Sequence, residues 1–221
     1  MTIRPASDRS FLVVFGESIS LESHRQVFHL TNALQSVRSI LNLHPAYASL
    51  LVEFDPRLCD RREIEALARE RAMDASAQSG AEDSRTIEIP VKYGGEFGPD
   101  LAHVAAHCGL DSAEVVARHS GARYLVNAVG FVPGFPYLGG LPESLRVPRR
   151  PTPRTNVPAG SVGIGGAQTG IYPMSTPGGW HLIGRTPLDL FKPAEEVPCL
   201  LHMGDRVRIR AITAEEFATW N

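Results

Sequence analysis

This 221-residue chain has little cysteine, no long hydrophobic run and no large excess of one charge. Its three cysteines, Cys59, Cys108 and Cys199, include no C-x-x-C pair, which argues against a thiolate zinc site and indicates a reduced protein. The apolar run 11–15 is too short for a signal peptide or a membrane span, so we expect a cytoplasmic protein without a membrane partner. A formal net charge of -2 disfavours a nucleic-acid partner.

Glycine and proline are rare in one part of the chain and abundant in another. Residues 1–83 hold two glycines and three prolines, whereas residues 130–193 hold 12 of the 20 glycines and 11 of the 17 prolines. The first part can therefore form regular helices and strands, and the second must consist of turns and short strands. With the polar stretch 74–84 as a linker, we expect two domains, 1–84 and 85–221.

The first domain is predicted to mix helices and strands. Leu50, Val52 and Phe54 alternate as in a half-buried strand, and Asp60 with Glu63 suits the start of a helix. The predicted strands are 10–15, 38–45, 48–54 and 85–93, and the predicted helices are 21–35 and 60–76. This β-α-β-β-α-β order suggests a small ferredoxin-like α/β domain.

The second domain is predicted to be mainly strands. Two short helices, 99–108 and 111–119, come first. The strands that follow are 124–129, 161–164, 170–173, 180–184, 188–191 and 205–211. Many short strands separated by Gly/Pro turns predict a closed or nearly closed barrel, so the fold class is α+β.

Several catalytic motifs are absent. The glycine-rich stretch 160–166 lacks the Lys-Ser/Thr of a phosphate-binding loop, and no G-x-S-x-G elbow or acid–base carboxylate pair is present, so we assign no catalytic residue. His103 and His107 are spaced to share one helix face, but no third ligand is evident, so we favour a solvated face over a metal site. His119 lies at the end of the next helix, where a cationic side chain would interact favourably with the helix dipole.

Acidic residues are also rare in the glycine- and proline-rich part. Residues 130–193 contain two acids, Glu143 and Asp189. The six basic residues there are Arg146, Arg149, Arg150, Arg154, Arg185 and Lys192. This excess implies an anionic partner, since arginine binds carboxylate and phosphate well. Alternatively, these arginines pair with acids of the other domain or of a partner protein.

Polar and aromatic groups accompany this basic segment. They are Gln168, Thr169, Tyr172, Ser175, Thr176, Trp180 and His181. Amide, hydroxyl and indole groups in a rigid frame suit a pocket for a small polar ring or acid. The aromatic run Phe131, Phe135 and Tyr137 is predicted to be core or pocket wall.

Six segments taken together resemble one family. They are VKYGGEFGPDL at 91–101, GFVPGFPYLGG at 130–140, PRR at 148–150 with PR at 153–154, VPAGSVGI at 157–164, QTGIYP at 168–173 and STPGGWHLIGRTP at 175–187. The chain resembles the family of the 5-oxoprolinase B subunit, which also carries the names KipI, a sporulation-kinase inhibitor, and allophanate hydrolase subunit 1. The resemblance implies a small α/β N-terminal domain followed by a cyclophilin-like β-barrel.

The resemblance also implies an activity shared with other chains. In that family a bacterial, ATP-dependent 5-oxoprolinase opens 5-oxo-L-proline to L-glutamate, and the partners are the A and C subunits of 5-oxoprolinase. This chain offers arginines but neither a phosphate-binding loop nor an evident Mg²⁺ carboxylate cluster. We therefore expect this chain to form half of a composite site and to be inactive alone. ATP and Mg²⁺ would be bound by the complex, and neither would be bound by this chain alone.

Roles for individual residues follow from the resemblance. Arg149 and Arg154 would hold the substrate carboxylate or a phosphoryl group. Gln168 and Tyr172 would hydrogen-bond the lactam edge. The ring would lie against Trp180 and Phe135, and Thr176 completes the expected substrate-binding set.

Other functions share the same motifs. A KipI-like protein would inhibit a sensor histidine kinase, and a protein like allophanate hydrolase subunit 1 would act in urea metabolism. A barrel whose Gly/Pro segment only docks a partner is a third alternative. Neighbouring genes would separate these alternatives, since homologues of the A and C subunits favour 5-oxoprolinase.

Overall fold

The chain forms two compact units, Met1–Asp83 and Ser84–Asn221. The computed structural model describes residues 1–17, 20–77 and 85–220. Part of the predicted linker, 78–84, lies outside the described residues, and residues 74–77 belong to a helix. No helix in the described part of the chain is long and apolar enough to cross a membrane.

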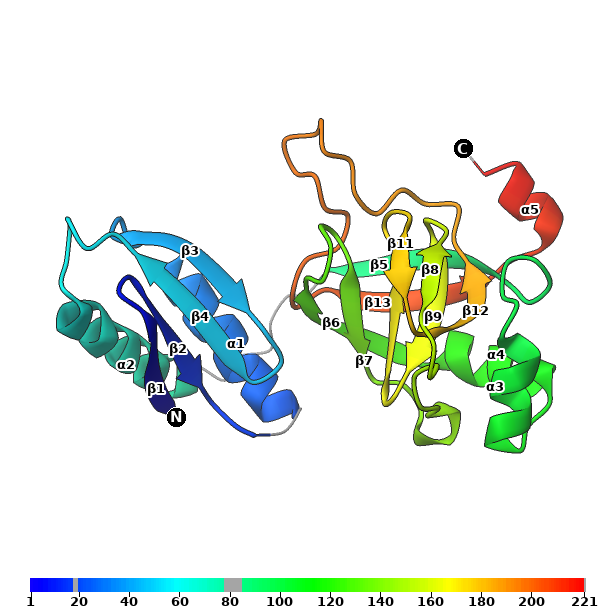
Figure 1. Ribbon diagram of the computed structural model, residues 1–221, viewed down its shortest axis with the longest axis horizontal. Coiled ribbons are helices and arrows are strands. Elements are labelled where there is room, and N and C mark those ends of the chain that lie inside the picture. Colours follow the sequence, from blue (N-terminus) through cyan, green and yellow to red (C-terminus); the bar gives the residue numbers. More distant parts are fainter. Residues whose placement is uncertain (18–19, 78–84, 221) are drawn as a thin grey trace. The chain divides into compact units, whose positions relative to one another are not determined.

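The first unit is a four-stranded antiparallel sheet with two helices on one face (Figure 1). Its elements are β1 (Thr2–Ser7), β2 (Ser10–Val14), α1 (Leu21–Leu34), β3 (Ile40–Pro45), β4 (Ser49–Phe54) and α2 (Arg61–Ala77). The sheet order is β1-β2-β4-β3. Leu50, Val52 and Phe54 are all buried, which confirms the predicted alternation in β4.

One edge strand of this sheet is not the segment that was predicted. Residues 85–93 were expected to complete the ferredoxin-like order, but they form β5 (Thr86–Tyr93) in the other unit, and β1 occupies the sheet edge instead. The residues of β1 are almost all exposed. An edge strand needs no hydrophobic alternation, so its sequence carries a weak strand signal.

The second unit contains a closed barrel, as predicted, and the barrel has seven strands. In barrel order the strands are β10 (Gln168–Ile171), β7 (Pro136–Gly139), β6 (Arg123–Val129), β13 (Arg206–Ala211), β5, β12 (His181–Arg185) and β9 (Ser161–Gly165). A separate two-stranded sheet pairs β8 (Arg154–Val157) with β11 (Thr176–Gly178). The strand predicted at 188–191 is wrong, since this segment contributes one isolated bridge between Phe191 and Cys199.

Short helices accompany the barrel. They are α3 (Leu101–Cys108), α4 (Ser112–Gly121), the 3-10 turn η1 (Glu143–Leu145) and α5 (Ala214–Ala218). Figure 1 shows α3 and α4 side by side at one end of the barrel. Asp111 and Glu114 form the predicted capping box at the start of α4.

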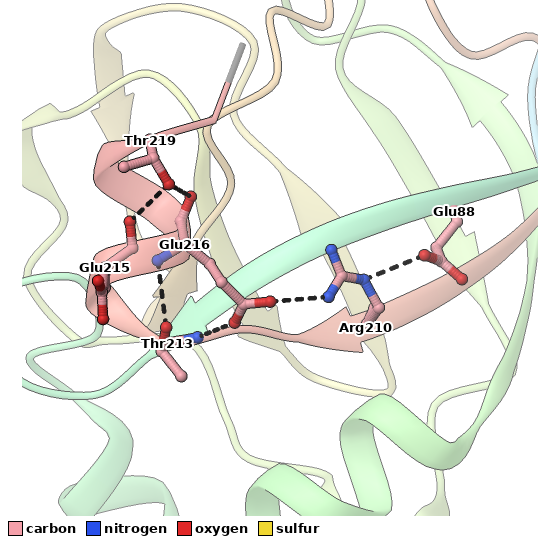
Figure 2. A network of polar contacts seen from close by, with 6 residues as sticks. All are labelled: Glu88, Arg210, Thr213, Glu215, Glu216 and Thr219. Atoms are coloured by element: carbon pink, nitrogen blue, oxygen red, sulfur yellow. Dashed lines mark hydrogen bonds and ion pairs between the residues drawn. The ribbon is translucent and has the colours of Figure 1, made fainter.

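The C-terminal helix is held by a polar network that Figure 2 shows. Arg210 on β13 donates from Nε to Glu88 on β5 and from Nη1 to Glu216 on α5, each at 3.1 Å. Thr213 caps α5 by accepting from the Glu216 N–H, and the Glu216 carboxylate accepts from the Thr213 N–H at 2.7 Å. The network therefore fastens α5 to the two strands that run parallel in the barrel.

His119 lies in the last turn of α4, as expected, but its side chain is buried in the barrel core and is not a cation. The His119 side chain is fully buried, and burial lowers its pKa to about 3. The Thr169 hydroxyl donates to the Gly163 carbonyl, so it accepts from His119 Nε2 at 2.9 Å. His119 Nδ1 then accepts from the Tyr93 hydroxyl at 2.7 Å. A neutral imidazole satisfies each of these bonds.

Candidate functional site

A cavity of about 450 Å³ opens between α3, the segment before β8 and the start of β12. Its lining residues are His103, His107, Val147, Pro148, Arg149, Arg150, Pro151, Thr152 and His181. Within the described chain, no acidic residue lines this cavity. We name it the arginine–histidine cavity.

Three histidines form one side of the arginine–histidine cavity. His103 and His107 are exposed, as a solvated helix face requires, yet both also line the cavity. The His103 ring stacks on His181, with centroids 4.7 Å apart and planes 17° apart. His181 Nε2 donates to the Pro148 carbonyl at 3.0 Å, and burial lowers the pKa of His181. A neutral His181 therefore joins the start of β12 to the cavity wall.

These histidines do not make a metal centre. The described residues contain no group of three or more His, Cys, Asp or Glu side chains that could hold a metal ion. The third imidazole, His181, already uses Nε2 for the Pro148 carbonyl. The donor set therefore does not fit the Mg²⁺ that the family resemblance implies, since Mg²⁺ prefers carboxylate and other oxygen ligands.

Asp100 organises the arginines beside the cavity. Arg154 donates from its two terminal nitrogens to the two Asp100 oxygens, each at 2.8 Å. Arg150 donates to Asp100 at 3.3 Å, and the Leu182 N–H donates to it at 2.7 Å. Burial alone would raise the pKa of Asp100, but the Arg154 and Leu182 hydrogen bonds outweigh it, so the pKa is lowered. Asp100 is therefore a carboxylate that ties the start of α3 to β8 and β12.

Arg149 and Arg150 bring positive charge to the cavity. The Arg150 N–H donates to the Gly179 carbonyl at 2.8 Å, which fixes its backbone. The Arg149 guanidinium lies over the Trp180 ring, 5.8 Å from the ring centroid. Together with Arg154, three guanidiniums accompany one carboxylate, Asp100, and leave an excess of two positive charges.

An aromatic cluster packs against Trp180. Phe135 packs edge-on against Trp180 and Tyr172, with ring centroids 5.6 Å and 5.1 Å away. All three side chains are at least 96% buried. They form a second small core. The roles of Phe135 as a pocket wall and of Tyr172 as a hydrogen-bonding partner of the ligand stay predictions, and the burial of both rings leaves little surface for a ligand to reach.

Glycine permits the close packing of this cluster. A Cβ atom on Gly165 would lie 2.5 Å from Trp180 Cδ1, and one on Gly170 would lie 2.9 Å from Phe135 Cζ. Either separation is shorter than carbon atoms tolerate. Some of the glycines in the family-like motifs therefore serve the approach of aromatic rings to the barrel strands.

The predicted site residues divide into two groups in the structure. Arg149 lines the cavity, Trp180 supports it, and Arg154 reaches the same network through Asp100. Arg154 was expected to hold the anion of a ligand. In the structure its two terminal nitrogens both donate to Asp100, an acid of the same chain. Gln168 on β10 and Thr176 on β11 are not among the cavity-lining residues.

Sequence reasoning missed the centre of this network. Asp100 enters the sequence argument only as part of a segment that resembles the family, although the helix that it precedes was predicted. Arg150 and His181 belong to the basic and polar groups that the sequence places at the expected pocket, but they are absent from the expected substrate-binding set; adjacency to Arg149 and Trp180 is the signal that could have added them. Their convergence with His103 and His107 arises from contacts between distant segments.

Comparison with known proteins shows the family. The chain matches the family model of the carboxyltransferase domain, subdomain C and D, over residues 1–201. It is 48% identical over 190 residues to the 5-oxoprolinase B subunit of Escherichia coli O157:H7, with 86% of each chain covered. It is 40% identical to the 5-oxoprolinase B subunit of Bacillus subtilis, over 97% of this chain and 94% of that protein. The chain belongs to the family of the 5-oxoprolinase B subunit.

Solved structures show the same fold inside longer chains. The structure of TTHA0988 superposes with a TM-score of 0.82 at 40% identity, covering 93% of this chain and 40% of that one. Urea amidolyase of Kluyveromyces lactis shares the fold, with a TM-score of 0.77 at 21% identity, over 15% of its length. The fold of this family therefore also occurs as one part of larger proteins.

Proposed function

We propose that this chain is the B subunit of an ATP-dependent 5-oxoprolinase complex, which opens 5-oxo-L-proline to L-glutamate with ATP hydrolysis. The names of the relatives at 40% to 48% identity support the family role. The observation that carries the proposal is the arginine–histidine cavity, which has an excess of positive charge and no acidic lining in the described chain. A site of this kind suits an anionic substrate.

The chemistry of a lactam explains why such a site is useful. Amide resonance makes the ring carbonyl carbon a poor electrophile, and phosphorylation of the carbonyl oxygen by ATP would activate it. Guanidinium groups that contact the phosphoryl oxygens would stabilise the negative charge in that step. Arg149 and Arg150 are the groups of this chain that we assign to the anion, whether it is this phosphoryl group or the substrate carboxylate.

The remaining parts of the reaction belong to partners in this proposal. The arginine–histidine cavity offers no acid–base carboxylate, and the described residues do not gather metal ligands. We therefore propose that homologues of the A and C subunits supply the groups that hold ATP and Mg²⁺ and that move protons. This chain is then inactive alone, and it acts in the cytoplasm.

A reconstitution experiment tests the proposal. The chain is co-expressed with homologues of the A and C subunits from the same genome, and phosphate release that depends on 5-oxoproline is measured. Each of the three chains is then omitted in turn. We expect release only from the full set, whereas undiminished release without this chain would contradict the proposal.

One second function has a specific observation in its favour. The chain is 28% identical to urea amidolyase of Lachancea kluyveri, over 98% of this chain and 14% of that protein. A role as the corresponding part of a urea-metabolising complex would follow from this likeness. Replacing 5-oxoproline with urea in the same assay, with a biotin-dependent carboxylase partner supplied, separates the two functions.

A further inference from the structure

We infer that the arginine–histidine cavity binds a phosphate dianion, either free or as the phosphoryl group of a larger ligand. This inference deepens the proposed function, because it chooses between the carboxylate and the phosphoryl group as the anion that the arginines hold. It rests on the proposed function only for the source of the phosphoryl group. The residues assigned to the oxyanion are Arg149, Arg150, His103 and His107.

The net charge beside the cavity favours a dianion. Asp100 neutralises one of the three guanidiniums, so two positive charges remain beside the cavity. A monocarboxylate such as 5-oxoproline would balance one of them, whereas a phosphate dianion balances both. Exposed imidazoles at His103 and His107 add donors whether neutral or protonated. The charge therefore favours a dianion over a single carboxylate.

The arginines at the cavity also have N–H donors without an acceptor in the described chain. Arg150 Nε is buried and has no hydrogen-bond partner among the described residues, although the same guanidinium is oriented by Asp100. A buried donor without an acceptor is costly, and an anionic oxygen from a ligand would satisfy it. The Arg149 guanidinium carbon lies over the Trp180 ring, and among the described residues no carboxylate pairs with this guanidinium, so its N–H groups can donate to the oxygens of an anion.

The backbone around the cavity holds these donors in place. Pro148 and Pro151 restrict the backbone that carries both arginines, and the Gly179 carbonyl holds the Arg150 N–H. This framework orients the donors before a ligand arrives, which lowers the entropic cost of binding. A volume of about 450 Å³ exceeds what one phosphate needs, so an attached organic group would also fit.

Calorimetric titration of the full chain tests the inference directly. Inorganic phosphate and 5-oxoproline are titrated separately at constant ionic strength and neutral pH. We expect saturable binding of phosphate and binding of 5-oxoproline that is about tenfold weaker or worse, a factor that corresponds to about 1.4 kcal/mol. Equal binding of the two ligands, or no saturable binding at millimolar phosphate, would overturn the inference.

Variants locate the binding. Arg149→Gln and Arg150→Gln should each weaken phosphate binding by about tenfold or more. Arg146→Gln is the matched control, because Arg146 lies in the same basic segment but pairs with Glu143 and does not line the cavity. Circular dichroism and thermal melts of each variant establish that it is folded. Phosphate binding that is unchanged in both cavity variants, or weakened equally by the control, would overturn the assignment.

Competition separates the source of the phosphate from the site itself. A non-hydrolysable ATP analogue that displaces phosphate supports a nucleotide phosphoryl group as the ligand, and a lack of displacement supports free phosphate. Both results retain the phosphate site. If phosphate binds as expected but the reconstituted complex does not consume 5-oxoproline, the proposed function fails and this inference stands.

Discussion

Arg154 holds both carboxylate oxygens of Asp100, with each of its terminal nitrogens 2.8 Å from one oxygen. Asp100 comes directly before α3, and Arg154 is the first residue of β8, so the pair joins segments 54 positions apart. The same carboxylate accepts from Leu182 on β12. One buried acid thus fixes the frame on which the arginine–histidine cavity is built.

Asp100→Asn should destabilise the second unit. The substitution removes the negative charge that Arg150 and Arg154 face, and it replaces one acceptor oxygen with an N–H donor, so at least one of the donors that Asp100 holds loses its acceptor. We expect a loss of about 2 kcal/mol, below the full value for a buried pair because both arginines are partly exposed. Urea unfolding monitored by tryptophan fluorescence measures the change.

A matched acid makes this prediction specific. Glu143 also pairs with an arginine, Arg146, but both side chains are more than half exposed. Glu143→Gln should therefore change stability by less than about 0.5 kcal/mol. Equal effects of the two substitutions would show that Asp100 is an ordinary surface partner.

The buried His119 predicts a loss of stability in acid. Its pKa is about 3 in the folded chain, against an ordinary value of 6.5, so the unfolded chain binds the proton more readily. The contribution of neutral His119 to the free energy of unfolding is complete above pH 6.5. It falls as the pH drops, by about 1.4 kcal/mol per pH unit, until the pH reaches the pKa of the folded state. Urea midpoints measured between pH 7 and pH 4 record this slope.

His119→Gln provides the comparison for that measurement. Glutamine does not titrate, so the variant should be less stable at pH 7 but should lose less stability between pH 7 and pH 4. The difference between the pH slopes of the two proteins isolates the effect of His119 from that of the other titratable groups. Parallel slopes would indicate that the imidazole is already solvated or charged in the folded chain.

Gly165→Ala should displace Trp180. The added Cβ would lie 2.5 Å from Trp180 Cδ1, so the indole must move or the strand must shift. We expect a loss of about 1 to 3 kcal/mol and a red-shifted tryptophan emission as the ring becomes more exposed. Gly130→Ala is the control, because a Cβ there meets nothing within 4 Å. An unchanged emission spectrum in Gly165→Ala would contradict the proposed packing.

Local patterns explain why much of the fold could be predicted. Alternation in 50–54 indicates the correct strand, the Asp111–Glu114 spacing indicates the correct helix start, and short strands between Gly/Pro turns indicate the barrel. Residues 85–93 are also predicted correctly as a strand. The partner of this strand could not be predicted locally, because pairing of β5 with β13 joins segments about 120 residues apart.

The site was less predictable for the same physical reason. Residue type and motif single out Arg149 and Trp180, and the structure brings them together. Asp100 and His119 owe their roles to burial and to partners distant in sequence, which no spacing rule encodes. Some glycines of the family-like motifs allow aromatic rings to approach the strands closely, and the burial of Phe135 and Tyr172 in that packing could not be predicted from residue spacing.

The most direct test of the account measures 5-oxoproline-dependent phosphate release from the complete complex with Arg149→Gln in this chain. Arg149 has no carboxylate partner among the described residues, so its loss should leave the fold intact and lower kcat/KM by about a hundredfold, as removal of one charge-stabilising donor does. The Arg146→Gln complex should stay within about twofold of the unaltered complex. Equal kcat/KM for the two variants, with normal assembly, would contradict the claim that this cavity holds the reacting anion.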